Sequence, residues 1–155
     1  MTQTLRIKFL KDTDTNFPLP AYETLGAAGL DLRAYLPKLE QENGRMLLPG
    51  DRALISSGFM IEIPYGFEGQ VRSRSGLALK HGVSLGNGVG TIDSDYRGAL
   101  GIIMINNGLK PFLIRHGARI AQIIISPIIR VRCEVVIKPS ITVRDSSGFG
   151  STGEI

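Results

Sequence analysis

Short runs of alternating apolar and polar residues recur along most of the chain. A period of two places alternate side chains on opposite faces of a β-strand, so that one face can pack against a core. No long stretch has the 3.6-residue period of a helix, and only residues 75–80 leave room for a turn or two of helix. The pattern predicts strands at residues 4–10, 30–34, 52–55, 59–63, 67–72, 98–105, 112–114, 120–125 and 131–137.

Turn-forming residues separate these runs, as at Pro49-Gly50 and Asn106-Asn107-Gly108. Many short strands joined by turns predict an all-β protein, a jelly-roll-like barrel or sandwich with one short helix. We expect a single β-domain over residues 1–143. Residues 144–155 are rich in Gly, Ser and Thr and too polar to form a core, so they are expected to be a flexible C-terminal arm.

Composition excludes several classes of protein. The net charge of +4 comes from 18 basic and 14 acidic residues that are mostly scattered, without the aromatic–basic interleaving of single-strand binders. We therefore expect no nucleic acid partner, and the apolar runs are too short for a membrane partner. The single cysteine, Cys133, forms no disulfide framework. The expected location is the cytoplasm, or an organelle if a transit segment has been removed.

One candidate anion site begins at Arg72-Ser73-Arg74. Ser75 is placed to cap the helix that follows, which would leave the first backbone N–H groups, including that of Gly76, free for a ligand. Arg74 could grip phosphate oxygens with its planar guanidinium. The alternative is an ordinary capped helix with solvated arginines.

Residues 86–98 form the segment richest in candidate chemistry. Its glycines allow close approach to a ligand, Asn87 offers a donor and an acceptor, and Asp93 and Tyr96 follow. The alternative is a glycine-rich loop that closes into an Asp/Ser turn. A calcium loop is excluded because Arg97 and Met104 stand where acidic ligands are needed.

Two further positions are open to more than one interpretation. Gln122 lies in an otherwise apolar strand, so its amide either satisfies neighbouring backbone or faces a polar site. Phe149, in the C-terminal arm, could stack on a flat ring while the surrounding glycines and hydroxyls wrap an anion. The alternative for the arm is a frayed terminus.

Taken together, these segments resemble the five ordered motifs of the homotrimeric deoxyuridine triphosphate nucleotidohydrolases (dUTPases). The resemblance spans residues 28–153, and the ordered set is far more specific than any one motif. The matching segments are residues 28–34, 74–78, 87–98 and 119–122, and Arg144 with residues 148–153.

The resemblance implies an enzyme that hydrolyses dUTP to dUMP and pyrophosphate. Such an enzyme limits uracil incorporation into DNA and supplies dUMP for thymidylate synthesis. By similarity, Asp93 is the catalytic carboxylate that activates a water for attack on the α-phosphorus. Tyr96 would lie against the deoxyribose and leave no room for a ribose 2′-hydroxyl.

The resemblance also implies the remaining site residues and partners. Asp31 would support an arginine from behind the substrate. Mg²⁺ would arrive on the triphosphate, with no direct protein ligand, and each site would be shared within a homotrimer, closed by the arm of one chain. The substrate-binding residues would be Arg74, Ser75, Gly76, Asn87, Gly90, Thr91, Tyr96, Gln122, Arg144, Phe149, Gly150, Ser151 and Thr152.

Other functions stay open at this point. A dCTP deaminase of related architecture usually carries a glutamate in the central motif, where this chain has Asp93 and Asp95 but no Glu. A dUTP-binding regulator without turnover would need no catalytic carboxylate. A purely structural β-sandwich would leave unexplained the loops whose residues are suited to binding phosphate.

Overall fold

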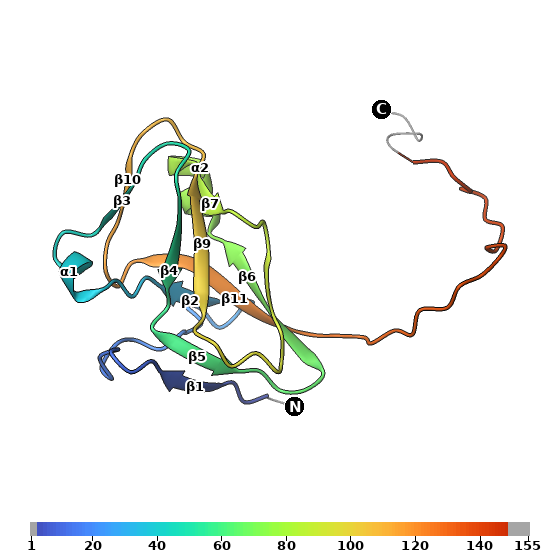
Figure 1. Cartoon of the computed structure of the whole chain (residues 1–155), viewed down its shortest axis with the longest axis horizontal. Helices are drawn as coiled ribbons and strands as arrows, with labels where there is room; N and C mark the ends of the chain where they lie inside the picture. The colour runs from blue at the N-terminus through green and yellow to red at the C-terminus, as the bar shows by residue number, and fades with distance from the viewer. Residues whose placement is uncertain (1–2, 149–155) are drawn as a thin grey trace.

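The computed structural model describes residues 3–148 and shows a body of short strands from which the C-terminal segment departs (Figure 1). The all-β prediction is confirmed. In chain order the elements are β1 Arg6–Phe9, β2 Leu30–Arg33, α1 Lys38–Gln41, β3 Arg45–Leu47, β4 Arg52–Ser56, β5 Phe59–Glu62, β6 Phe67–Ser73, α2 Ser75–His81, β7 Val83–Leu85, β8 Gly90–Ile92, β9 Gly101–Asn106, β10 Phe112–Ile114 and β11 Arg119–Pro127.

All the strand pairs of the described residues are antiparallel. The largest sheet has the order β2-β11-β6-β8, and a second has the order β4-β9-β7. The pairs β1-β5 and β10-β3 complete the body. Neighbours in these sheets are mostly distant in sequence, as expected of a jelly-roll-like fold rather than a series of simple hairpins.

The core lies between the sheets and is built by the predicted alternation. In β9, Ile102 and Met104 are fully buried, whereas Ile103 between them faces outward. Leu32 of β2, Ile55 of β4 and Ile123 of β11 meet them in the same cluster. Burial of these aliphatic side chains is the main force that holds the sheets together.

Four short elements were not predicted from the sequence. Strands β3, β7 and β8 have three residues each, and unlike the equally short but uniformly apolar β10 each includes a polar residue or a glycine. Helix α1 is a single turn without a side-chain cap. It is tied to β3 by Arg45, whose Nε and Nη2 donate to the two carboxylate oxygens of Glu40 at 2.7 and 2.6 Å.

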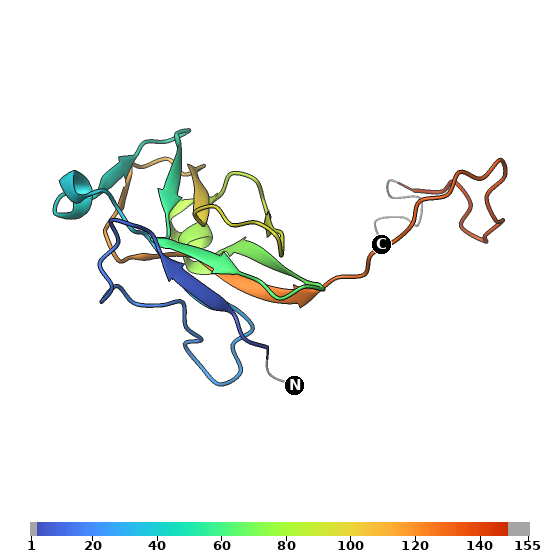
Figure 2. The same cartoon turned by 60° about the horizontal axis from the view of Figure 1, so that its bottom comes forward.

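The strand predicted at residues 131–137 is wrong, because residues 128–137 continue from β11 as an extended, irregular segment. Figures 1 and 2 show this segment leaving the body beyond β6 and β11. Among the described residues, no strand lies beside it to complete a backbone ladder, which a β-strand requires. Its apolar side chains, such as Val135 and Ile137, are exposed to water.

A β-bulge interrupts β11 where it pairs with β2. The register shifts between Arg119, which faces Arg33, and Ala121, which faces Leu32. An extra residue reverses the sense of alternation along a strand. As a result Ile120 and Ala121 are both buried, and Arg119 and Gln122, three positions apart, reach the same hollow.

His116 lies just before β11 in a small aromatic cluster. Its ring centroid lies 5.3 Å from that of Phe17 and 5.0 Å from that of Tyr35. The Leu36 N–H donates to His116 Nδ1 at 3.1 Å. Burial among these groups lowers the pKa of His116 below its ordinary value, because the cluster disfavours the imidazolium form.

Candidate active site

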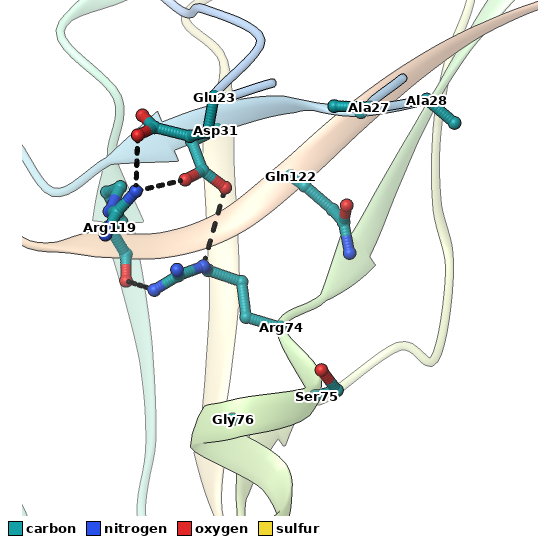
Figure 3. Close-up of a pocket in the computed structure, with 10 residues that line it drawn as sticks. Glu23, Ala27, Ala28, Asp31, Arg74, Ser75, Gly76, Arg119 and Gln122 are labelled. Carbon is teal, nitrogen blue, oxygen red and sulfur yellow. Dashed lines mark hydrogen bonds and ion pairs between the residues drawn. The ribbon is translucent and has the colours of Figure 1, made fainter. Parts of the chain in front are cut away.

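A polar hollow of about 360 Å³, here called the arginine pocket, lies between the β2-β11 pair and the start of α2 (Figure 3). It brings together several residues that the sequence singled out from separate motifs. Its lining residues are Glu23, Ala27, Ala28, Gly29, Asp31, Arg74, Ser75, Gly76, Arg119 and Gln122.

Strand register places the polar side chains of the arginine pocket. Gln122 on β11 is paired directly with Asp31 on β2 and with Arg72 on β6. Residues directly opposite each other in an antiparallel ladder direct their side chains to the same face of the sheet. Asp31 and Gln122 are therefore neighbours at the pocket, and the bulge adds Arg119 beside them.

Asp31 contacts two arginines at once. Its Oδ1 lies 3.4 Å from Arg74 Nε, and its Oδ2 accepts a hydrogen bond of 3.1 Å from Arg119 Nη1 (Figure 3). Arg74 Nη1 also donates to the backbone carbonyl of Arg119 at 3.0 Å. The Asp31 side chain is only 14% exposed, so it fixes both guanidinium groups from within the fold.

Glu23 is a member of this network that the sequence did not point to. Its Oε2 lies 2.8 Å from the same Arg119 Nη1 that Asp31 binds, and its side chain is 49% exposed. The pocket therefore holds two carboxylates and two guanidiniums. Glu23 comes from the loop before β2, far from Arg119 in sequence, so no local spacing could have revealed the contact.

Gln122 both satisfies backbone and lines the pocket. Its Nε2 donates to the carbonyl of Ser73 at 3.1 Å. A Cβ on residue 29 would come within 2.6 Å of Gln122 Oε1, so a side chain there would push the Gln122 amide out of its present position.

The start of α2 differs in detail from the prediction. The N-cap residue is Arg74, with φ −88° and ψ 122°, and no side chain caps the helix. Ser75 is the first helical residue rather than the cap. Its hydroxyl therefore makes no capping bond to the following turn, and it lines the arginine pocket with Gly76.

A second hollow of about 290 Å³, here called the tyrosine pocket, lies against the outer face of β9. Asp93 and Tyr96 both line it, which brings together two residues of the central motif. The full lining is Leu54, Thr91, Ile92, Asp93, Tyr96, Ala99, Gly101 and Ile103.

A tight turn sets Asp93 beside Tyr96. The Tyr96 N–H donates to the Asp93 carbonyl at 3.2 Å across this turn. The Tyr96 hydroxyl donates to the carbonyl of Ala99 at 3.1 Å, which holds the ring across Gly98. Both side chains are exposed, so a ligand in the tyrosine pocket could reach them.

Thr91 lines the tyrosine pocket, and Gly90 and Asn87 precede it in the chain. Asn87 is in the turn between β7 and β8, and Gly90 and Thr91 begin β8. Strand β8 ends the sheet order, with β6 as its partner on one side. An edge strand has backbone groups without a ladder partner, and these can bind another molecule.

The structure does not bring all the predicted residues into one site. The two pockets share no lining residue. Arg144 lies in the segment outside the body, where its Nε donates to the carbonyl of Ser147 at 2.9 Å. Phe149, Gly150, Ser151 and Thr152 fall outside the described residues.

Within residues 3–148, no group of three or more His, Cys, Asp or Glu side chains is arranged to hold a metal ion. The carboxylates of the arginine pocket are already engaged by guanidiniums, which makes them poor candidates for a protein-built metal cage. None of the helices in the same range has the length and hydropathy to cross a membrane.

Comparison with known proteins gives a consistent result. The family model described as dUTPase matches residues 15–153. The deoxyuridine 5′-triphosphate nucleotidohydrolase of Roseobacter denitrificans is 51% identical over 149 residues, which is 96% of this chain and 95% of the relative. That of Rhizobium rhizogenes is 53% identical over 135 residues, covering 87% and 85%.

Solved structures agree with the sequence relatives. The dUTPase of Staphylococcus bacteriophage 80alpha, solved with dUPNHPP, superposes with a TM-score of 0.83 at 28% identity. The alignment covers 98% of this chain and 99% of that one.

Proposed function

The chain belongs to the dUTPase family, and from this membership we propose that it hydrolyses dUTP to dUMP and pyrophosphate. The observation that carries the proposal, beside the family, is the turn that sets Asp93 and Tyr96 in one pocket. In the cell the reaction would keep uracil out of DNA and supply dUMP for thymidylate synthesis. That role acts on the free nucleotide pool, for which we propose a cytoplasmic location.

The proposed chemistry is an in-line attack of water on the α-phosphorus. Asp93 would accept a proton from the water as its oxygen bonds to phosphorus, and the bond to the bridging oxygen of the β-phosphate would break. Pyrophosphate would leave and dUMP would remain. The exposure of Asp93 at the tyrosine pocket supports this role, because a general base must reach the attacking water.

Selection of the nucleoside is assigned to the tyrosine pocket. The Tyr96 ring, fixed by its hydroxyl bond to Ala99, would pack on the deoxyribose and exclude a 2′-hydroxyl by contact. Asn87, with Gly90 and Thr91 on the edge strand β8, would hydrogen-bond the uracil. An edge strand supplies both N–H donors and carbonyl acceptors, which matches the alternating acceptors and donor of the uracil edge.

Phosphate binding is assigned to the arginine pocket. Arg74, Ser75, Gly76 and Gln122 would contact the triphosphate, while Asp31 holds Arg74 in place from behind. Preorganised donors bind developing phosphate charge without rearranging during the reaction. The contacts of Asp31 with both arginines support this division of roles.

We further propose that a complete site needs three chains. One chain holds its arginine pocket and tyrosine pocket as separate hollows, and a homotrimer would join pockets of neighbouring chains. The C-terminal arm of a third chain would close the site, with Phe149 over the uracil and Arg144, Gly150, Ser151 and Thr152 near the γ-phosphate. The extended segment after β11 supports this, because it leaves the body rather than folding onto it (Figure 2).

We propose that Mg²⁺ enters the site as part of the substrate. It would arrive coordinated to the triphosphate oxygens, carrying its own waters, and would neutralise charge on the leaving pyrophosphate. In this proposal the protein residues bind the triphosphate around the ion and do not form a cage for it.

The deciding experiment is release of pyrophosphate from dUTP, dCTP, dTTP and UTP, each with and without Mg²⁺. We expect release from dUTP and little from the others. Deamination of dCTP without pyrophosphate release would instead support a deaminase. Binding of dUTP without any turnover would contradict the proposal and support a regulator.

A further inference from the structure

Arg97 immediately follows Tyr96 and binds the turn that carries the proposed chemistry. Its Nη1 donates to the carbonyl of Ser94 at 2.7 Å and to the carbonyl of Tyr96 at 2.9 Å. The only backbone hydrogen bond across the turn is that of 3.2 Å between Tyr96 and Asp93. The guanidinium therefore supplies two of the hydrogen bonds that define the shape of the turn.

The other end of the guanidinium reaches the body of the protein. Arg97 Nη2 lies 3.5 Å from Glu62 Oε1 on β5. The same oxygen lies 3.7 Å from Nη1 of Arg6 on β1, whose backbone is paired with that of Glu62. Arg97 thus links the turn to the β1-β5 pair, whereas Arg6 pairs with Glu62 and makes no hydrogen bond or ion pair to residues 93–96.

Arg97 lies behind the turn rather than in the tyrosine pocket. It lines a separate hollow with Glu62, Arg6, Ser94 and Asp95. Asp93 and Tyr96 line the tyrosine pocket on the other side of the turn, and neither faces the hollow of Arg97. In this chain Arg97 is therefore positioned to act on the site through the backbone.

We propose that Arg97 is a positioning residue that fixes Asp93 relative to Tyr96 and so sets both the turnover of dUTP and its discrimination from UTP. The inference rests on the proposed function of the two residues. A displacement of about 1 Å at a reacting group can cost as much as a hundredfold in rate. Exclusion of the ribose 2′-hydroxyl by contact with Tyr96 likewise depends on the position of the Tyr96 ring.

The geometry requires an arginine. One planar guanidinium contacts two carbonyls and a carboxylate with donors set in a fixed fork. A lysine would keep the charge but place it on one compact ammonium, which cannot span the same three oxygens. Arg97→Lys should therefore behave like Arg97→Ala.

The test compares Arg97→Ala and Arg97→Lys with the matched control Arg6→Ala, which removes the other partner of Glu62. Both Arg97 variants should lower kcat for dUTP about tenfold or more with KM changed by less than about threefold. The preference for dUTP over UTP in kcat/KM should fall about tenfold. Arg6→Ala should match the wild-type protein in both quantities.

A second measurement does not depend on turnover. The ratio of the dissociation constants of UMP and dUMP, measured by calorimetry, should fall in both Arg97 variants and stay unchanged in Arg6→Ala. Thermal unfolding of each variant confirms that it is folded, and Arg97→Lys decides the matter if the alanine variant does not fold.

Two outcomes would overturn the inference. Unchanged kcat and unchanged selectivity in folded Arg97 variants would show that the turn holds its shape without the guanidinium. A rise in KM alone, restored by lysine, would show that Arg97 contacts the substrate by its charge. Neither outcome concerns the proposed function itself, which fails only if the wild-type protein does not hydrolyse dUTP.

Discussion

The phenol ring of Tyr96 lies across Gly98 so closely that a methyl group on residue 98 would overlap the tyrosine hydroxyl. Glycine is needed at this position for space, since the hydroxyl must pass over it to reach the carbonyl of Ala99. The position of the Tyr96 ring thus depends on Gly98, which has no side chain of its own to contact a ligand.

Replacing Gly98 by alanine should move the Tyr96 ring and weaken selection against the ribose. We expect kcat/KM for dUTP to fall about tenfold and the relative activity on UTP to rise, because the ring no longer packs in place. Gly26→Ala is the control, since a side chain there meets nothing within 4 Å. Steady-state kinetics on both nucleotides make the comparison, and an unaltered Gly98→Ala enzyme would contradict the assignment of Tyr96.

Asp93→Asn should abolish turnover and retain substrate binding. The amide can still accept a hydrogen bond from water but cannot take its proton, so we expect a loss of at least about a hundredfold in kcat. Asp95→Asn is a matched control, because Asp95 lies on the same turn and faces the other hollow. If Asp93→Asn hydrolysed dUTP at the wild-type rate, another group would have to activate the water.

Asp31→Asn should damage the arginine pocket more than Glu23→Gln does. Both carboxylates bind Arg119 Nη1, but the Asp31 side chain is 14% exposed and that of Glu23 is 49% exposed. We expect Asp31→Asn to lower the free energy of unfolding by about 1–3 kcal/mol and to raise KM about tenfold. Glu23→Gln should cost less than about 1 kcal/mol. Equal effects in urea unfolding would show that burial does not separate the two contacts.

Stability should fall as the pH drops below about 6.5, the ordinary pKa of histidine. Burial lowers the pKa of His116 in the folded protein, so between the two pKa values the unfolded chain binds more protons than the folded one. The free energy of unfolding therefore rises with pH across this window, and the stability that depends on neutral His116 is complete above it. Thermal unfolding from pH 5 to pH 8 measures the slope.

His116→Asn is the informative variant for this pH dependence. The asparagine oxygen can take the place of Nδ1 as acceptor for the Leu36 N–H, but the side chain does not titrate. The slope should become shallower in the variant. An identical slope in both proteins would assign the acid sensitivity to other groups.

Shared sites can be tested by mixing two inactive variants. Deleting residues 144–155 should cripple turnover while leaving the body folded, and Asp93→Asn is inactive for a different reason. If each site takes Asp93 and the arm from different chains, refolding the two variants together should restore part of the activity. Mixtures no more active than their components would indicate that each chain builds its own site.

The sequence predicted the elements whose pattern is long enough to read. Strands such as β9 and β11 carry five or more alternating or apolar positions, and their ends differ from the prediction by a few residues. The strand at residues 131–137 has the same alternation but no neighbour within the described chain. Alternating apolar residues indicate a segment that can form a β-strand with one buried face. They do not indicate whether the partner strand comes from the same chain or from another.

The candidate site was predictable where its residues lie in ordered motifs and not where they meet through the fold. The family resemblance led us to expect Arg74 and Gln122 at a phosphate site, and both line the arginine pocket. The sequence could not reveal Glu23, because that contact depends on the bulge in β11 and on the path of a distant loop. The sequence predicted Ser75 as the N-cap because serine often caps helices, whereas α2 begins one residue earlier, with Arg74 as the N-cap.

The extended segment after β11 has a consequence for how the protein is made. A newly synthesised chain presents Ile129, Val131, Val135, Ile137 and Ile141 to water, each at least 79% exposed. Alternating aliphatic residues with free backbone groups readily join whatever strand edge they first meet. During maturation, pairing of this segment with its partner in the assembled protein therefore competes with aggregation. Slow synthesis at low temperature should favour the correct pairing.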